Sequence, residues 1–221
     1  DPDVSQIILI AAPDYRQSGV YQDHELSSLT WHLDQTFESF DTRPDLPRET
    51  HENLKRALAL ARAYAANPEG WLILTGACGC GKTHLAAAIA NHAQGVSGRA
   101  ALFVFVPDLL DHLRATFNPQ SAVSYDTRFD EVRNAPLLIL DDLGTESATP
   151  WAREKLYQVF NHRYNARLPT VITMARTLES LSQADPRMAA RMADVSRCTV
   201  FAIEAPDYRG GPATRRKKRR T

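Results

Sequence analysis

A glycine-rich stretch from Trp71 to Thr83, WLILTGACGCGKT, constrains this chain more than any other feature. It opens with four apolar residues, Trp71 to Leu74, which predict a buried strand. The residues from Gly76 to Thr83 match the phosphate-binding P-loop pattern in full, and the alanine-rich run from His84 to Gln94 predicts a helix. A strand, a glycine loop and a helix in this order are the context that the P-loop motif requires. The stretch therefore predicts a site for the phosphates of a nucleotide.

The residue types in the loop suit a bound triphosphate. Glycines let backbone N–H groups turn toward an anion, and the positive end of the following helix faces the same point. We expect Lys82 to reach the β- and γ-phosphates and the Thr83 hydroxyl to bind Mg²⁺. Cys78 and Cys80 are interpreted as small residues that fill the loop. The residues expected to contact ATP or ADP are Gly76, Ala77, Cys78, Gly79, Cys80, Gly81, Lys82, Thr83 and His84. A chance glycine turn with a lysine is the alternative, and the flanking strand and helix argue against it.

Composition limits the class of protein. A length of 221 residues suits one large domain with a sizeable core. Acidic and basic residues balance at 26 each, but the run Arg215 to Arg220 holds six of the basic ones, so the preceding residues are mildly acidic. Three cysteines, two of them in the P-loop, suggest no disulfide framework and favour a reduced, cytoplasmic setting. No apolar run has membrane-spanning length and no signal peptide is visible, so we expect no membrane partner.

The first 48 residues are interpreted as an N-terminal arm or linker. Gln6 to Ala12 is compatible with a strand, and prolines recur at Pro44 and Pro47, as expected of a connector that enters a domain. We expect Phe37 and Phe40 to pack against the body of the protein. A role for them in holding an adenine ring is the less favoured alternative.

We expect residues 49–209 to form the folded core. Its expected strands are Trp71–Leu74, Ala100–Val106, an apolar run that ends in Asp141 and Asp142, Pro169–Met174 and Cys198–Ile203. Its expected helices are Glu49–Ala66, His84–Gln94, Asp108–Phe117, Asp126–Asn134, Pro150–Arg167 and, in pieces, Leu178–Val195. Short apolar strands that alternate with helices predict an α/β fold, with five parallel strands covered by helices on both faces.

Two aspartates form the second chemical landmark. Asp141 and Asp142 follow a predicted strand, as the P-loop does, and the carboxyl ends of parallel strands meet in one crevice. We expect Asp141 to bind Mg²⁺ beside Thr83, and Asp142 to polarise a water for attack on the γ-phosphate. Phosphoryl transfer mainly requires that a protein position the reacting groups and neutralise the charge of the phosphates, so these side chains suffice in principle for ATP hydrolysis. The alternative is a solvated strand end.

Basic residues gather in two further places. Arg187 and Arg191 lie four positions apart and share one face of a predicted helix. An arginine inserted into a neighbouring nucleotide site would stabilise charge on a γ-phosphate, but spacing alone favours a solvated basic face. The C-terminal run, within the 210–221 tail that we expect to be disordered, either grips a nucleic-acid backbone or has no function.

With these motifs in place, the chain resembles the AAA+ ATPases of the DnaC/DnaI helicase-loader group and the related IstB-like ATPases. The resemblance runs from about Phe37 to Arg209. It is carried by TFESFDTR, by GACGCGKTHLAAAIANH, by LLILDDLGTE and by APDYR. It implies a P-loop NTPase of the AAA+ type that self-associates into a ring or spiral with ATP at subunit interfaces. It also implies an arginine finger in PRMAARMAD, for which Arg191 is the better candidate and Arg187 the second.

One departure from the family pattern bears on catalysis. Members of the group usually place a polar sensor residue, often asparagine, after the fourth strand, where this chain has Ala175. Alanine can neither orient a water nor contact a phosphate. Hydrolysis is therefore expected to be weak, or Thr173 or Arg176 substitutes. The N-terminal domain common in these loaders is also not recognisable in residues 1–36.

The leading hypothesis is an ATPase that acts in DNA replication as a helicase loader and binds single-stranded DNA and a replicative helicase. An IstB-like transposition helper, which would bind duplex DNA and a transposase, is the nearest alternative. A nucleotide-gated binding switch with little turnover is the third.

Overall fold

The structure is a computed structural model that describes residues 25–116, 124–144 and 149–209. The predicted strand at Gln6–Ala12 and the basic run Arg215–Arg220 lie outside the described residues. None of the helices in the described ranges combines the length and apolar composition that a bilayer span requires.

Five parallel strands form one sheet in the order β2-β3-β4-β1-β5. Their bounds are β1 Trp71–Gly76, β2 Ala101–Phe105, β3 Leu137–Leu143, β4 Thr170–Met174 and β5 Cys198–Ile203. All five predicted strands are present, so the predicted α/β P-loop fold is confirmed. β1 continues two residues past its predicted end at Leu74, and β3 includes both aspartates.

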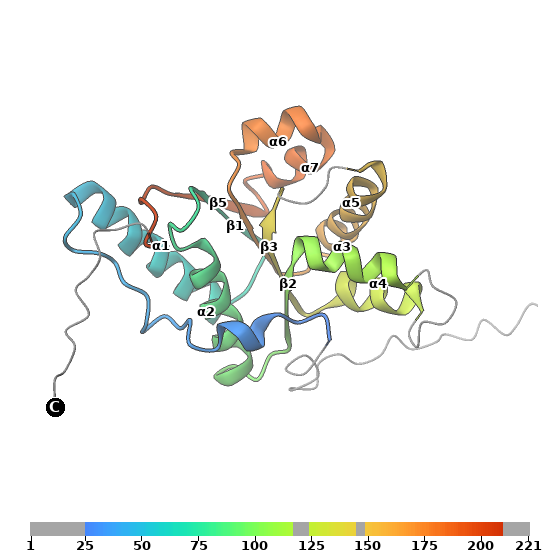
Figure 1. Cartoon of the computed structure of the whole chain (residues 1–221), viewed down its shortest axis with the longest axis horizontal. Helices are drawn as coiled ribbons and strands as arrows, with labels where there is room; N and C mark the ends of the chain where they lie inside the picture. Colours follow the sequence, from blue (N-terminus) through green and yellow to red (C-terminus); the bar gives the residue numbers. More distant parts are fainter. Residues whose placement is uncertain (1–24, 117–123, 145–148, 210–221) are drawn as a thin grey trace, which may run out of the picture.

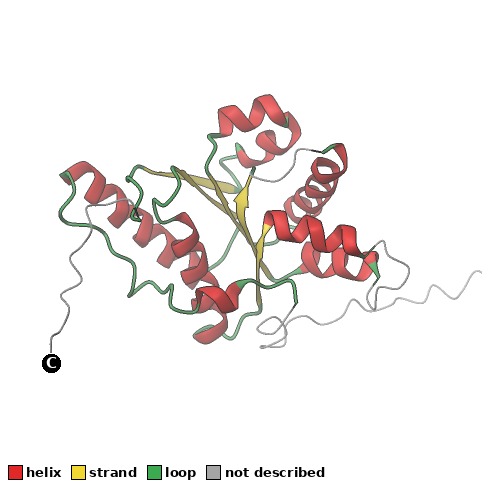
Figure 2. Cartoon of the chain, in the orientation of Figure 1, coloured by secondary structure: helices red, strands yellow, loops and turns green. Residues whose placement is uncertain are grey.

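Helices cover both faces of this sheet (Figure 1, Figure 2). Their bounds are η1 Leu29–His32, α1 Arg48–Ala66, α2 Lys82–Gly95, α3 Val106–Ala115, α4 Tyr125–Asn134, α5 Pro150–Asn165, α6 Leu178–Ala184 and α7 Pro186–Met192. Alternate residues of β1 serve the two cores: Trp71 and Ile73 pack with α3, α4 and α5, whereas Leu72 and Leu74 pack with α1 and α2. Both faces are therefore apolar, which is why the strands read as continuous hydrophobic runs.

Several predicted helix boundaries differ from the structure by a few residues, and two of the differences have a clear physical cause. α3 begins at Val106 rather than Asp108, because Pro107 fits the first helical turn, where its missing N–H is not needed. α5 ends at Asn165 rather than Arg167, because Arg167 adopts a left-handed conformation with φ of 55° that stops the helix.

A buried arginine ties α5 to its surroundings. Arg163 is fully buried, and its Nε donates a hydrogen bond to Thr170 Oγ1 at 2.9 Å. Its Nη1 donates to the carbonyl oxygens of Arg133 and Ala135 at 3.1 and 2.8 Å, and its Nη2 donates to that of Pro169 at 2.6 Å. The guanidinium thus donates hydrogen bonds to the carbonyl oxygens of Arg133 and Ala135 at the C-terminal end of α4, where a positive charge is favoured.

The arm, described here from residue 25 to 47, packs along α2. Phe37 is buried in the core on that side, as predicted. The Asn91 side chain donates to the carbonyl oxygens of His32 and Gln35 at 2.9 and 3.0 Å, and Ser28 N donates to Phe103 O. The arm therefore reaches the P-loop helix, whereas the division of the chain at residue 48 stays a prediction.

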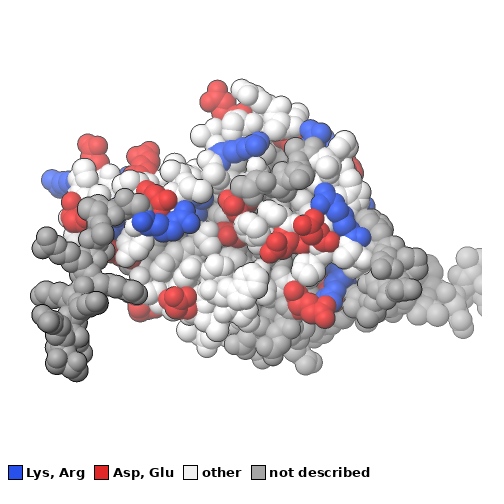
Figure 3. Space-filling view, viewed as in Figure 1, with Lys and Arg blue, Asp and Glu red and all other residues white. Residues whose placement is uncertain are grey.

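Figure 3 shows acidic and basic side chains interspersed over one face of the described residues. The concentrated positive charge of the sequence thus belongs to its C-terminal run, outside the described part.

Candidate nucleotide-binding site

The P-loop connects β1 to the first turn of α2, as the motif requires. Two of its glycines are fixed by close neighbours as well as by backbone conformation. A Cβ on Gly79, whose φ is 71°, would lie 1.9 Å from Asp207 Oδ1, and one on Gly81, whose φ is 110°, would lie 2.9 Å from the Phe40 ring. Any other residue at these two positions would strain the backbone and displace the segments that cover the loop.

Lys82 is the first residue of α2 and is almost fully buried. Its Nζ donates to the carbonyl oxygens of Gly76 and Ala77 at 2.9 and 2.8 Å, and it lies 3.9 Å from Cys80 Sγ. The Lys82 side chain thus reaches back from the start of α2 to the carbonyl groups of Gly76 and Ala77, at the beginning of the loop.

Asp141 lies next to the P-loop helix although the two are far apart in sequence. Thr83 Oγ1 donates to its two carboxylate oxygens at 3.0 and 3.1 Å, and Thr173 Oγ1 donates to Oδ1 at 2.6 Å. Burial raises the pKa of Asp141, and the hydrogen bonds from the two threonines act in the opposite direction. The structure therefore joins the two chemical landmarks of the sequence.

Asp142 is held in an uncommon backbone conformation. Its φ is 62°, which is costly for a residue other than glycine. Its N–H donates to Thr173 Oγ1 at 2.9 Å, so one buried threonine hydroxyl bonds both aspartates. Because Asp142 turns at the end of β3, its carboxylate lines the same cavity as Asp141.

A cavity of about 490 Å³ lies over the P-loop, and Lys82, Thr83 and Asp141 all line it. Much of the rest of its wall comes from two segments at opposite ends of the described chain. The arm contributes Phe40, Asp41 and Arg43, and the closing segment (residues 204–209) contributes Tyr208 and Arg209.

The arm and the closing segment contact each other and the loop. Arg43 Nη1 donates to Pro206 O at 2.7 Å, and Tyr208 N donates to Gly79 O at 2.9 Å. His84 Nε2 lies 2.9 Å from Thr36 O and 3.2 Å from Ser39 Oγ. His84 thus bonds the arm and also lines the cavity, and its predicted contact with the nucleotide stays a prediction.

Sequence reasoning did not assign Arg43, Tyr208 and Arg209 to the site. The only signal for two of them was the APDYR stretch, which was recognised as a motif without a role. Phe40, which was expected mainly to pack, sits at the cavity wall with its ring edge-on to that of His84 at 5.2 Å.

Arg187 and Arg191 do not line this cavity in their own chain. Arg191 Nη2 donates to Asn161 Oδ1 at 2.5 Å and to Tyr157 OH at 3.1 Å. The Arg187 guanidinium lies 4.0 Å from the centre of the Tyr157 ring and 3.5 Å from Glu154. Both arginines therefore lie over α5, away from the P-loop cavity of their own chain.

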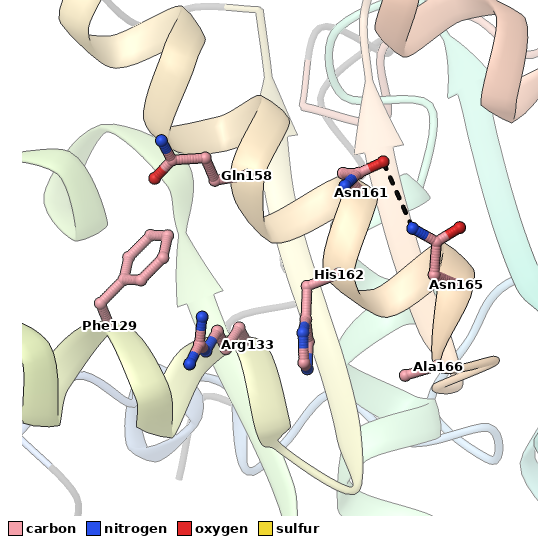
Figure 4. A pocket seen from close by; sticks show the side chains of 7 residues that line it. All are labelled: Phe129, Arg133, Gln158, Asn161, His162, Asn165 and Ala166. Carbon is pink, nitrogen blue, oxygen red and sulfur yellow. Dashed lines mark hydrogen bonds between the residues drawn. The ribbon is translucent and has the colours of Figure 1, made fainter.

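A second cavity, of about 390 Å³, lies between α4 and α5 (Figure 4). Gln158, Asn161 and His162 line it from α5, and Phe129 and Arg133 line it from α4. Burial lowers the pKa of His162, whose Nε2 lies 2.8 Å from Asn134 Oδ1. Its lining residues include neither a glycine loop nor a carboxylate, so it differs in chemistry from the cavity at the P-loop.

The residues of the P-loop cavity fit a nucleotide with a divalent cation. The close approaches at Gly79 and Gly81 leave no room for a Cβ, and a buried lysine lies in the loop. A hydroxyl and a carboxylate, from Thr83 and Asp141, supply the oxygen atoms that Mg²⁺ prefers. The described residues hold no cluster of three or more His, Cys, Asp or Glu side chains suited to a metal, and a cation bound partly by phosphates needs none.

Comparison with known proteins agrees with this site. The model of the family described as IstB-like ATP binding protein matches residues 15–218. The replicative helicase loader DnaC of Escherichia coli strain K12 is 27% identical over 135 residues, which cover 60% of this chain and 54% of the relative. The replicative helicase loader DnaI of Bacillus subtilis is 35% identical over 100 residues, which cover 45% of this chain and 31% of the relative. This chain spans about half the length of the curated DnaC relatives that it matches.

A solved structure shares the fold. The crystal structure of the DnaC helicase loader superimposes with a TM-score of 0.65, at 23% identity, and the match covers 79% of this chain and 99% of that one. The likeness shows that the five-stranded sheet and its helices have the AAA+ arrangement.

Proposed function

The chain belongs to the IstB-like ATP binding protein family, and on this premise we propose that it hydrolyses ATP and acts in DNA replication as a helicase loader. The observation that carries the proposal is that the P-loop and the acidic end of β3 meet: Thr83 of the P-loop helix donates a hydrogen bond to Asp141 of β3. The similarity to DnaC and DnaI supports the loader role and, with it, binding of a replicative helicase and single-stranded DNA.

Each residue at the site has a proposed task. Lys82 neutralises charge on the β- and γ-phosphates, and the loop from Gly76 to Gly81 cradles them with backbone N–H groups. Thr83 and Asp141 hold Mg²⁺, which supplies charge neutralisation between the phosphates when bound. Asp142 orients the attacking water and accepts its proton.

We propose that Thr173 positions the two aspartates and so compensates for Ala175. Ala175 is exposed beyond the end of β4, whereas Thr173 is fully buried and bonds both Asp141 Oδ1 and Asp142 N. A Thr173→Val variant keeps the shape but loses these bonds. We expect kcat to fall about 10- to 100-fold, because a displaced catalytic group costs that much. ATP affinity should stay within about threefold, since Lys82 and the loop are unchanged.

Steady-state ATPase kinetics and magnesium titrations would check this expectation. Thr173→Ser should restore turnover, and Thr199→Val, at an exposed position of β5, is the matched control. A Thr173→Val enzyme with wild-type kcat, or with a loss confined to KM, would show that Thr173 is only a packing residue.

Arg191 is proposed to act as an arginine finger in a neighbouring subunit's site, with Arg187 as the second candidate. The support is its place on α7, apart from the cavity of its own chain, together with the family's oligomeric ATPases. For Arg191 to reach a neighbour, it must exchange its bonds to Asn161 and Tyr157 for a phosphate. In the structure of the single chain, Arg191 is therefore held by hydrogen bonds to α5.

The function is tested by assembly and turnover measured together. We expect ATP to shift the sedimentation of the chain toward larger species and single-stranded DNA to stimulate turnover. If sites are shared between subunits, a mixture of Lys82→Ala and Arg191→Ala chains should regain turnover that neither shows alone. Assembly and turnover that ignore both ligands would contradict the loader proposal, and a pull-down with ATP followed by mass spectrometry would identify the partner.

The family match also supports a second candidate, a transposition helper. Preference for duplex DNA and capture of a transposase would favour it. The exposed Ala175 supports a third candidate, a nucleotide-gated switch, which would bind ATP and assemble with turnover no faster than a Lys82→Ala chain.

A further inference from the structure

The P-loop carries two thiols, Cys78 and Cys80, on either side of Gly79. Cys80 N donates to Ala77 O at 3.4 Å, which closes a tight turn that contains both cysteines. Alpha carbons two positions apart are at most about 7 Å from each other. A disulfide accepts separations of about 4.4–6.8 Å, so residues at this spacing can approach the range that the bond needs.

The two thiols have different surroundings. Cys78 is exposed and lines the cavity. Cys80 is buried, with its Sγ 3.9 Å from Lys82 Nζ. Burial raises the pKa of the Cys80 thiol, so Cys78 is the one that meets a dissolved oxidant first.

We infer that Cys78 and Cys80 form a reversible disulfide that switches off phosphate binding at the P-loop. With hydrogen peroxide as the oxidant, the Cys78 thiolate attacks one peroxide oxygen, the O–O bond breaks, and a sulfenic acid and hydroxide form. The Cys80 thiolate then attacks the Cys78 sulfur, the S–O bond breaks and a second hydroxide leaves. The two hydroxides take up the two thiol protons as water. Two thiols and one peroxide thus give one disulfide and two waters.

The packing of Cys80 explains why this bond would disable the site. Its Sγ lies beside Lys82 and 3.0 Å from where a Cβ on Gly76 would be, so it fills the inner side of the loop. To reach Cys78 it must leave this position and change the turn that Gly79 and Gly81 shape. The loop then presents its N–H groups in other directions. Because so short a loop strains the bond, a dithiol reductant should open it readily.

The experiment uses the whole chain and two independent readouts. After treatment with peroxide, the chain is unfolded in urea so that buried thiols become accessible, free thiols are labelled with N-ethylmaleimide, and the sites are mapped by mass spectrometry. We expect only Cys198 of the three cysteines to be labelled, and all three after dithiothreitol. In parallel, affinity for a fluorescent ATP analogue should fall about tenfold or more and recover on reduction. In a glutathione redox buffer, ATP should lower the fraction of chains that hold the disulfide at equilibrium, because the coupling between the two is reciprocal.

The Cys78→Ser variant should keep its ATP affinity after peroxide treatment. Cys198→Ser is the control, and its ATP affinity should still fall after peroxide and recover on reduction. Cys198 is a buried thiol that donates to Arg191 O. Labelling of Cys80 after peroxide would overturn the inference, as would a bond between chains or a disulfide that leaves ATP affinity unchanged. The second readout rests on the proposed nucleotide site, whereas the labelling does not. A reduced chain that fails to bind ATP therefore refutes the proposed function, and the thiol map alone then decides whether the bond forms.

Discussion

Replacing Arg163 with methionine should lower the free energy of unfolding by about 3–5 kcal/mol, which is in the uppermost range for a single substitution. Methionine has similar length but no donor. It would leave the carbonyl oxygens of Arg133, Ala135 and Pro169 buried without the hydrogen bonds that the guanidinium gives them. Urea unfolding followed by circular dichroism measures the change.

Arg153→Met is the matched control, since Arg153 lies exposed on the same helix. We expect its unfolding free energy to stay within about 0.5 kcal/mol of the wild type. Equal changes in the two variants would mean that the buried hydrogen bonds contribute little net stability, as can happen where an apolar side chain replaces a buried charge.

Replacing Lys82 with alanine should weaken ATP binding about 100-fold or more, equivalent to about 2.7 kcal/mol. The ammonium group is the one lysine charge at the P-loop cavity among the described residues, and it already lies across the loop. Stability should change far less, by about 1–2 kcal/mol, because only hydrogen bonds within the loop are lost. Isothermal titration with ATP and magnesium gives the affinity.

Lys55→Ala is the control for charge alone, because Lys55 is an exposed residue of α1 that pairs with Glu52. It should leave ATP affinity unchanged. ATP bound equally well by Lys82→Ala would mean that the P-loop is not the phosphate site, and every role assigned around it would then be withdrawn.

Much of the fold could be predicted because its signals are local. The strand that holds Leu72 and Ile73 is apolar throughout, and the glycine loop after it fits few other structures. The meeting of Thr83 with Asp141 was also predictable, because parallel strands end at one edge of the sheet. Membership of the resembled family is now established by the match over residues 15–218.

The rest depends on contacts between distant segments, which residue patterns do not encode. Nothing local to Asp207 indicates that its carboxylate sits against Gly79. The double bonding of Thr173 to both aspartates likewise follows from the register of β3 and β4 with its bulge, and not from the residues near it. The roles assigned to the site residues, including the arginine finger, stay predictions.

Two hydrogen bonds hold the closing segment against the P-loop and the arm: Tyr208 N donates to Gly79 O, and Arg43 Nη1 donates to Pro206 O. If nucleotide binds in the loop as proposed, it contacts the backbone to which the closing segment is bonded, and we expect residues 204–209 to shift with it. A dye attached just beyond Arg209 would then change its rotational freedom when nucleotide arrives. Such a dye would follow occupancy of the loop in real time without a labelled nucleotide.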